Sequence, residues 1–192
     1  MPTNDVRANM VKGAARLLAT RGVEGTSFTE VLETANAPRG SIYHHFPGGK
    51  SELLHAALDL VSTRGLEAME EVRGQTAAAV VGRFLGLWRQ LLDATKLDGG
   101  CAVVAVTVAE PETSLLDHAG TIFRSWSDQL TELLTVGGLA EPTARQFAVL
   151  LIAATEGAVV MCRAERNRQP FDITAAYLSN RVNSEASARH RL

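Results

Sequence analysis

The sequence has little cysteine, and it lacks long hydrophobic runs. Cys101 and Cys162 are the only two cysteines among 192 residues and form no CxxC pair, so the spacing predicts neither a disulfide framework nor a zinc site. We expect both to be small core or pocket residues, and the sequence alone leaves a redox role for either one open. No apolar run approaches the roughly 20 residues of a membrane helix, so we expect no membrane-spanning segment.

An excess of charge of one sign is also missing. The chain has 19 Lys and Arg residues against 21 Asp and Glu residues, a net charge of -2, which gives no general attraction to nucleic acid. Residues 1–50 carry six bases and four acids, a local charge of +2, and a difference this small does not by itself indicate a DNA-binding surface. Charges are scattered through the apolar positions of the first 22 residues, so we expect no signal peptide and a cytoplasmic location.

Recognisable signatures of catalysis are absent from the sequence. It contains no Gly-rich phosphate loop, nucleophile elbow, HExxH motif or grouped carboxylate pair. His44 and His45 are adjacent, and neighbouring helical residues point about 100° apart, so the two rings cannot chelate one metal ion together. We therefore expect no enzyme activity, no cofactor and no metal site.

The sequence does contain helical periodicity along most of its length. Apolar residues recur at spacings of three and four, which predicts an all-α fold. The β-branched segment 101–109 has a local preference for a strand, but no second strand candidate exists to pair with it. Residues 142–166, opened by Pro142, are apolar nearly all round and are expected to be buried on both sides, at the centre of one subunit or between two subunits. Glu156 in this segment either faces a ligand or pairs with an arginine across a dimer, since a lone buried carboxylate is costly.

Three helices are predicted within the first fifty residues. The first ends at Gly22, and the second begins at Ser27, whose spacing to Glu30 is that of a capping box. The third runs from about Pro38 to Phe46 and is ended by Pro-Gly-Gly. We place a domain of residues 1–50 here, a larger helical domain over 51–182 that begins with a helix from about residue 50 to residue 72, and a disordered tail over 183–192, where apolar periodicity is lost.

The segment from Thr26 to Lys50 is the most informative part of the sequence. A helix that reads the major groove needs an exposed edge of hydrogen-bonding side chains and an apolar back. Ile42 and Phe46, four residues apart, are expected to point toward Val31 and Ala35 of the preceding helix. The residues left for the groove are Arg39, Gly40, Ser41, Tyr43 and His44.

Phosphate contacts are expected at two helix starts. Lys50 and the free amides at the start of the fourth helix form one site, and Thr26 and Ser27 at the start of the second helix form another. Gly40 allows a close approach of the backbone to DNA, and Arg39 either donates two hydrogen bonds to a guanine or meets a phosphate.

The run Tyr43-His44-His45-Phe46 followed by Lys50 resembles the DNA-binding segment of the TetR family of bacterial repressors. Asn36 stands where this family usually has Gly in the turn, and Asn tolerates the left-handed region better than most residues. Pro38 removes a backbone donor at the helix start. The segments Pro47–Lys50 and Asp98–Val104 are similar to the LmrA/YxaF-like branch, whose members sense small aromatic or drug-like compounds.

The resemblance implies an N-terminal helix-turn-helix unit followed by a larger helical ligand-binding and dimerisation domain. It implies a homodimeric repressor that is released from a palindromic operator on double-stranded DNA when a small hydrophobic or aromatic effector binds, with helix 142–166 in the dimer interface. The competing interpretations are simple core packing for the aromatic residues and, for the whole chain, a helical adaptor that does not bind DNA. The effector-binding candidates are Trp88, Cys101, Val104, Phe123, Trp126 and Met161.

Overall fold

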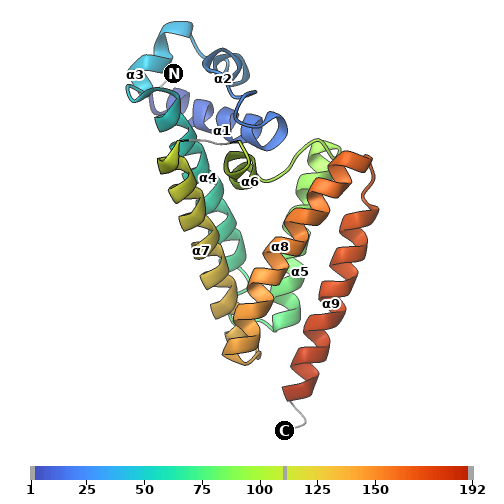
Figure 1. The fold of residues 1–192 in the computed structure, drawn as a ribbon. Coiled ribbons are helices and arrows are strands. Elements are labelled where there is room, and N and C mark those ends of the chain that lie inside the picture. Colours follow the sequence, from blue (N-terminus) through green and yellow to red (C-terminus); the bar gives the residue numbers. More distant parts are fainter. Residues whose placement is uncertain (1–2, 110–111, 190–192) are drawn as a thin grey trace. The chain divides into compact units, whose positions relative to one another are not determined.

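The fold is helical throughout the described part of the chain, as the periodicity predicts. The computed structural model describes residues 3–109 and 112–189, and no strand occurs within these two ranges (Figure 1). Within segment 101–109, which has a local preference for a strand, residues Ala102–Thr107 form the short helix α6 instead. The elements are α1 Thr3–Arg21, α2 Phe28–Ala35, the 3₁₀ turn η1 Arg39–Ser41, α3 Ile42–His45, α4 Gly49–Glu70, α5 Ala77–Thr95, α6 Ala102–Thr107, α7 Thr113–Val136, α8 Glu141–Glu165 and α9 Gln169–Arg189.

The chain divides into two compact units, each built from two separate chain segments. The first unit comprises Met1–Arg64 and Cys101–Ile122, and the second comprises Gly65–Gly100 and Phe123–Leu192. This division falls inside α4 and α7, whereas the sequence places a boundary at residue 50. The physical reason is that α6, distant in sequence, packs against α1, and that α4 continues without interruption past residue 50.

In the first unit, α1 packs against α2 and α6. Helix α2 begins where the Ser27 side chain accepts a hydrogen bond from the Glu30 amide at 3.2 Å, which confirms one half of the predicted capping box. The Glu30 carboxylate pairs with Arg21 at 2.5 Å instead of reaching back to the cap. Helix α2 ends at Asn36, whose φ of 49° and ψ of 46° place it in the left-handed region, so Asn here does what Gly usually does at this turn.

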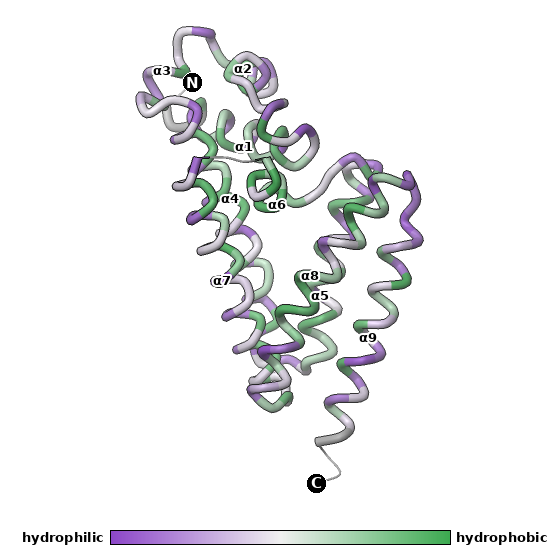
Figure 2. The backbone as a smooth tube through the Cα atoms, in the orientation of Figure 1, coloured by the Kyte–Doolittle hydropathy of each residue, from purple (hydrophilic) through white to green (hydrophobic). Residues whose placement is uncertain are grey.

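The core of the second unit lies among α5, α7, α8 and α9. Helices α8 and α9 pack against each other, and α5 contacts both. Figure 2 shows hydrophobic residues along most of α8. The buried face of α8 carries Ala144, Phe147, Ala148, Leu151, Ile152, Thr155, Ala158, Val159 and Cys162.

Helix α8 also leaves an apolar face uncovered within one chain. Its exposed large side chains are Val149, Leu150, Val160 and Met161, between 52% and 60% exposed. Among the described helices, α8 alone is long and apolar enough to cross a membrane, and 44% of its most apolar 18-residue stretch is buried inside the structure. Core helices of soluble proteins have the same length and apolar composition, so this is weak evidence for a membrane span.

The C-terminal segment differs from the prediction of a disordered tail. Residues 183–189 continue α9 to Arg189, while residues 190–192 lie outside the described part of the chain. The helix is anchored upstream by the buried side chains Phe171, Ala175, Leu178 and Val182. Adding residues to an existing helix avoids the unfavourable nucleation step, which explains how a stretch without apolar periodicity remains helical.

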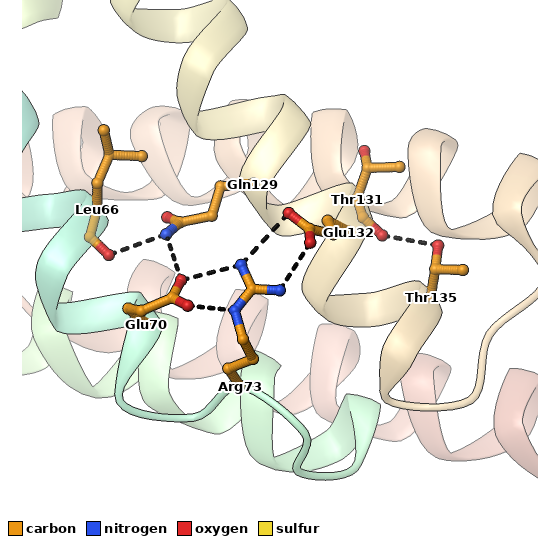
Figure 3. A network of polar contacts seen from close by, with 7 residues as sticks. All are labelled: Leu66, Glu70, Arg73, Gln129, Thr131, Glu132 and Thr135. Atoms are coloured by element: carbon orange, nitrogen blue, oxygen red, sulfur yellow. Dashed lines mark hydrogen bonds and ion pairs between the residues drawn. The ribbon is translucent and has the colours of Figure 1, made fainter.

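A polar network joins the end of α4 to α7 within the second unit (Figure 3). The Arg73 guanidinium bonds to both the Glu70 carboxylate and the Glu132 carboxylate, the latter at 2.7 Å. Gln129 donates to the Leu66 carbonyl at 3.0 Å and to Glu70 at 3.1 Å. The hydrogen bond from Arg73 is the main cause that lowers the pKa of Glu70, and the two carboxylates raise the pKa of Arg73.

Candidate nucleic-acid interface

The segment expected to read DNA is shorter and more tightly wound than predicted. In place of one helix over 38–46, a three-residue 3₁₀ turn (η1) is followed by the four-residue helix α3. Pro38, with φ -63° and ψ 140°, stands outside the helix, and its carbonyl accepts from both the amide and the hydroxyl of Ser41, at 3.0 and 2.6 Å. These bonds over three residues select the 3₁₀ form at the start of the segment.

The inner face of this segment is fully buried. Ile42 is 1% exposed and Phe46 is 0% exposed, and Val31 of α2 is buried as well, as the spacing predicts. Ala35, expected in the same contact, is only half-buried, while its neighbour Leu32 is buried. The guanidinium of Arg7 on α1 lies 4.9 Å from the centre of the Phe46 ring, a cation–π distance that the sequence did not indicate.

The outer face of the segment carries exposed polar groups. Arg39, Gly40 and His44 are exposed, and Tyr43 is 69% exposed. The Tyr43 ring meets the ring of Phe28 edge to face, with centroids 5.6 Å apart, so the side chain has a support although it projects into solvent. A Cβ atom added at Gly40 would meet nothing within 4 Å, which leaves the backbone open at this point.

The Lys50 side chain makes a contact that sequence reasoning missed. Its Nζ donates a hydrogen bond to the Val23 carbonyl at 2.9 Å, and the group is partly buried. An ammonium has three donors, so two remain for another partner. The two residues are 27 positions apart, and no local pattern links them.

Two corrections apply to the expected phosphate sites. Thr26 is 0% exposed and its hydroxyl donates to the Gly22 carbonyl at 2.8 Å, so it closes the turn between α1 and α2 and cannot reach a phosphate. The amides of Gly48 and Gly49 at the start of α4 are not free, because they donate to Glu52 at 2.9 Å and to the Phe46 carbonyl at 3.0 Å. Ser27 is half-buried and acts as the N-cap of α2.

Three of the predicted effector-binding residues belong to the second unit. Trp88, Phe123 and Trp126 are partly buried against its hydrophobic core, and the rings of Phe123 and Trp126 meet edge to face with centroids 5.8 Å apart. The indole Nε1 of Trp126 is buried without a hydrogen-bond partner. This nitrogen lies 3.4 Å from the place that a Cβ on Gly65 would occupy. The indole N–H without a partner is therefore next to Gly65 of α4.

The other three candidates are placed differently. Cys101, which is buried, and Val104, which is half-buried, belong to the first unit at α6. Met161 is 52% exposed on the outer face of α8, so its expected place in a pocket is corrected. A surface hollow of about 510 Å³ in the second unit is lined by none of the six candidates; its lining comes from the end of α5 and the start of α9, with Asp93, Lys96, Arg168 and Asp172 among the residues.

Neither cysteine has the features of a reactive thiol. Both side chains are buried, and neither forms a disulfide. Burial raises the pKa of the Cys162 thiol, although a hydrogen bond from the Phe171 amide at 3.3 Å opposes this. A raised pKa keeps Cys162 in the protonated thiol form, which is less nucleophilic than the thiolate.

Both halves of the chain match known families. Residues 10–57 match the family described as "Bacterial regulatory proteins, tetR family". Residues 77–177 match the family described as "Transcriptional regulator LmrA/YxaF-like, C-terminal domain". The first match contains the whole segment from Thr26 to Lys50, and the second contains α5 to α8 and the start of α9.

Relatives of known name cover almost the whole chain. A protein named an uncharacterised HTH-type transcriptional regulator of Mycobacterium tuberculosis is 31% identical over 192 aligned positions, which cover 96% of this chain and 98% of the relative. The HTH-type transcriptional repressor DhaR of a Mycobacterium species is 24% identical, covering 90% of this chain and 89% of the relative. A crystal structure of a TetR-family transcriptional regulator from Agrobacterium tumefaciens has the same fold, with a TM-score of 0.81, 22% identity and coverage of 93% of this chain and 98% of that one.

Proposed function

Because the chain belongs to the TetR family of bacterial transcriptional regulators, in its LmrA/YxaF-like branch, we propose that it is a repressor released from its operator by a small hydrophobic or aromatic effector. Its relatives are DNA-binding transcriptional regulators and not enzymes. One of them, DhaR, is named a repressor, which supports the direction of control proposed here. We place its action in the cytoplasm, where the chromosome of a bacterium lies.

The observation that carries the proposal is the two-sided build of residues 39–46. Buried Ile42 and Phe46 anchor the segment in the first unit, while Arg39, Tyr43 and His44 project outward, and a Cβ added at Gly40 would meet nothing within 4 Å. This is the arrangement that a groove-reading element requires.

We assign these groups separate roles on DNA. Arg39, Gly40, Tyr43 and His44 face the major groove, and Ser41 contributes its hydroxyl only as an acceptor because its proton is donated to Pro38. The two remaining donors of Lys50 contact phosphate, which sets the position of the protein without reading sequence.

A second copy of the chain covers the apolar face of α8 in this proposal. Val149, Leu150, Val160 and Met161 are more than half exposed on α8, and α9, which packs beside it, adds exposed Ile173 and Tyr177. Exposed apolar patches of this kind mark interaction sites in soluble proteins. For both recognition segments of such a dimer to enter successive major grooves, they must lie about 34–36 Å apart, and the twofold symmetry then calls for a palindromic operator.

The effector binds the helical part of the chain in this proposal, next to Trp88, Phe123 and Trp126. Large aromatic side chains with few polar groups are typical of small-molecule pockets. The buried Nε1 of Trp126 lacks a partner, and an indole N–H only donates, so the effector is expected to carry a hydrogen-bond acceptor. Effector and operator binding must then oppose each other equally, because coupling between two binding sites is reciprocal.

The test is a fluorescence-anisotropy titration of the full-length protein with DNA flanking its own gene and with a random-sequence pool. Arg39→Ala should weaken specific binding, by about 1–3 kcal/mol for a bidentate contact to guanine. Gly40→Ala is the sharper variant, because the added Cβ meets nothing in the protein and the fold is preserved, so a loss of binding reports close approach to DNA.

Gly82→Ala is the matched control, since a Cβ at Gly82 also meets nothing within 4 Å and α5 has no role on DNA in this proposal. The expected result is specific binding that Arg39→Ala and Gly40→Ala weaken and Gly82→Ala leaves unchanged. Failure to select any sequence from the random pool would overturn the repressor proposal.

A further inference from the structure

Two histidine rings are stacked between α4 and α7 in the first unit. His55 on α4 and His118 on α7 have ring centroids 4.8 Å apart and planes inclined by only 19°. Their Nδ1 atoms are 2.7 Å apart, a hydrogen-bond distance. The other nitrogen of His118, Nε2, lies 2.8 Å from the Oδ1 atom of Asp59, one turn after His55 on α4.

This geometry fixes where the protons lie when both rings are neutral. A carboxylate only accepts, so His118 must donate its Nε2 proton to Asp59. The Nδ1 of neutral His118 is then without a proton and accepts the Nδ1 proton of His55. The chain of bonds runs from His55 through His118 to Asp59, and it ties α4 to α7 at two points.

The first added proton leaves this chain intact, and the second breaks it. The first is taken up by the free Nε2 of His55, so the bond to His118 becomes a hydrogen bond from a charged donor. The second must go to the Nδ1 of His118, which removes the only acceptor between the rings. Two N–H groups would then face each other across 2.7 Å between two stacked cations, with Asp59 able to balance only one charge.

We propose that the pair His55 and His118 is a proton-operated latch, which holds α4 against α7 at neutral pH and opens in acid when both rings are protonated. Its link to gene control rests on the proposed function. The first unit also contains α2, η1, α3 and the Lys50 end of α4, so a release of α4 from α7 loosens the packing of the helices that carry the DNA-binding groups. Opening therefore lowers operator affinity.

One carboxylate, that of Asp59 on α4, contacts the latch directly. Besides Asp59, the carboxylate of Glu112 accepts from Ser51, one turn before His55, at 3.1 Å. Helix α6 carries no ionisable side chain, and α1, with Lys12 and Arg16 among its bases, packs against α2 and α6. The Asp59 carboxylate can balance one positive charge on the pair, whereas a second would face the first across the stacked rings.

The first experiment uses no DNA and so tests the latch separately from the proposed function. Thermal unfolding of the full-length protein is measured in EDTA at about pH 7.5 and about pH 5.5, which spans the titration of histidine. His55→Asn keeps an amide near the position of Nδ1 but cannot take up a proton. The wild type should lose about 3–6 °C more than His55→Asn over this range, whereas equal losses would overturn the latch.

A measurement on the wild type keeps the proposal testable if His55→Asn does not fold. Nitrogen NMR of the imidazole rings at neutral pH should show His118 protonated at Nε2 and His55 protonated at Nδ1. A neutral His118 protonated at Nδ1 would overturn the latch, since the ring could then not accept from His55.

The second experiment measures operator affinity over the same pH range. The comparison is between the wild type and His55→Asn, which both keep His44 and His45, so any contribution of those two rings to the pH dependence is common to both proteins. Acid should weaken binding by the wild type about tenfold more than binding by His55→Asn, a factor within the range typical of coupled sites. Unchanged pH dependence after His55→Asn would refute the link to DNA, while absence of binding at every pH would refute the proposed function instead.

Discussion

Replacing Lys50 with Met is expected to change the salt dependence of operator binding as well as the affinity. One N–H of the ammonium is held by the Val23 carbonyl at 2.9 Å, and two donors remain for a phosphate. The variant removes both the hydrogen bond within the protein and the proposed contact with DNA. The two effects are separable, because only the loss of a phosphate contact alters how many counterions are released.

The magnitude follows from the number of contacts. Each phosphate contact contributes about 0.9 to the slope of log affinity against log salt, and the proposed dimer would present Lys50 twice, so the variant should lose about 1.8 from the slope. Between about 50 and 200 mM salt, the wild type should therefore lose about ten times more affinity than Lys50→Met does.

Fluorescence anisotropy with one operator fragment at four or more salt concentrations measures both slopes. The control is Lys96→Asn, which also removes one positive charge, at a position in the left-handed region with φ 52° where Asn is well tolerated. The control slope should equal that of the wild type. A Lys50→Met protein with weaker binding but an unchanged slope would show that Lys50 acts only through Val23, and the phosphate role would be wrong.

Three further outcomes are expected. Gly137→Ala should reduce the free energy of unfolding by about 1–3 kcal/mol, because the added Cβ would lie 2.6 Å from the Ala77 amide nitrogen. Gly82→Ala should instead raise the free energy of unfolding by about 0.5–1 kcal/mol. Chemical denaturation measures both, and equal effects of the two variants would contradict the packing argument. Leu150→Glu should yield a folded monomer in analytical ultracentrifugation, and a persistent dimer would remove the α8 face from the interface. The Arg73 hydrogen bond lowers the pKa of Glu70 in the folded protein, which stabilises the fold at pH values above the unfolded-state pKa and is lost as pH falls through the folded-state pKa. Arg73→Gln should therefore lower the melting temperature at neutral pH and match the wild type in strong acid. A difference in melting temperature that does not change with pH would contradict the pairing of Arg73 with Glu70.

The sequence predicts those parts of the site that depend on short-range spacing. Ile42 and Phe46 are four residues apart, so their shared burial follows from helical geometry alone. The cap at Ser27 and the left-handed turn at Asn36 are equally local, and the structure has both. The rejection of a strand over 101–109 is also correct, because it rested on the lack of any strand partner, and residues Ala102–Thr107 are helical.

The parts that sequence reasoning missed depend on contacts between distant residues. Lys50 meets Val23, Arg7 lies over Phe46, and His55 stacks on His118, 63 positions away. None of these pairs has a periodic signal. The burial of Thr26 is missed for a related reason, because the same hydroxyl suits an exposed helix start and a closed turn equally well.

If the element from Arg39 to His45 reads DNA as proposed, its shortness limits how much sequence one subunit can distinguish. A 3₁₀ residue advances about 2.0 Å and an α-helical residue about 1.5 Å, so the element is about 12 Å long, the rise of three to four base pairs in B-form DNA. A DNA sequence of only three to four base pairs recurs many times in any genome. In the proposed dimer, selectivity must therefore come from requiring two such short sequences at one fixed separation, so inserting a few base pairs between the half-sites should abolish recognition as completely as mutating one of them.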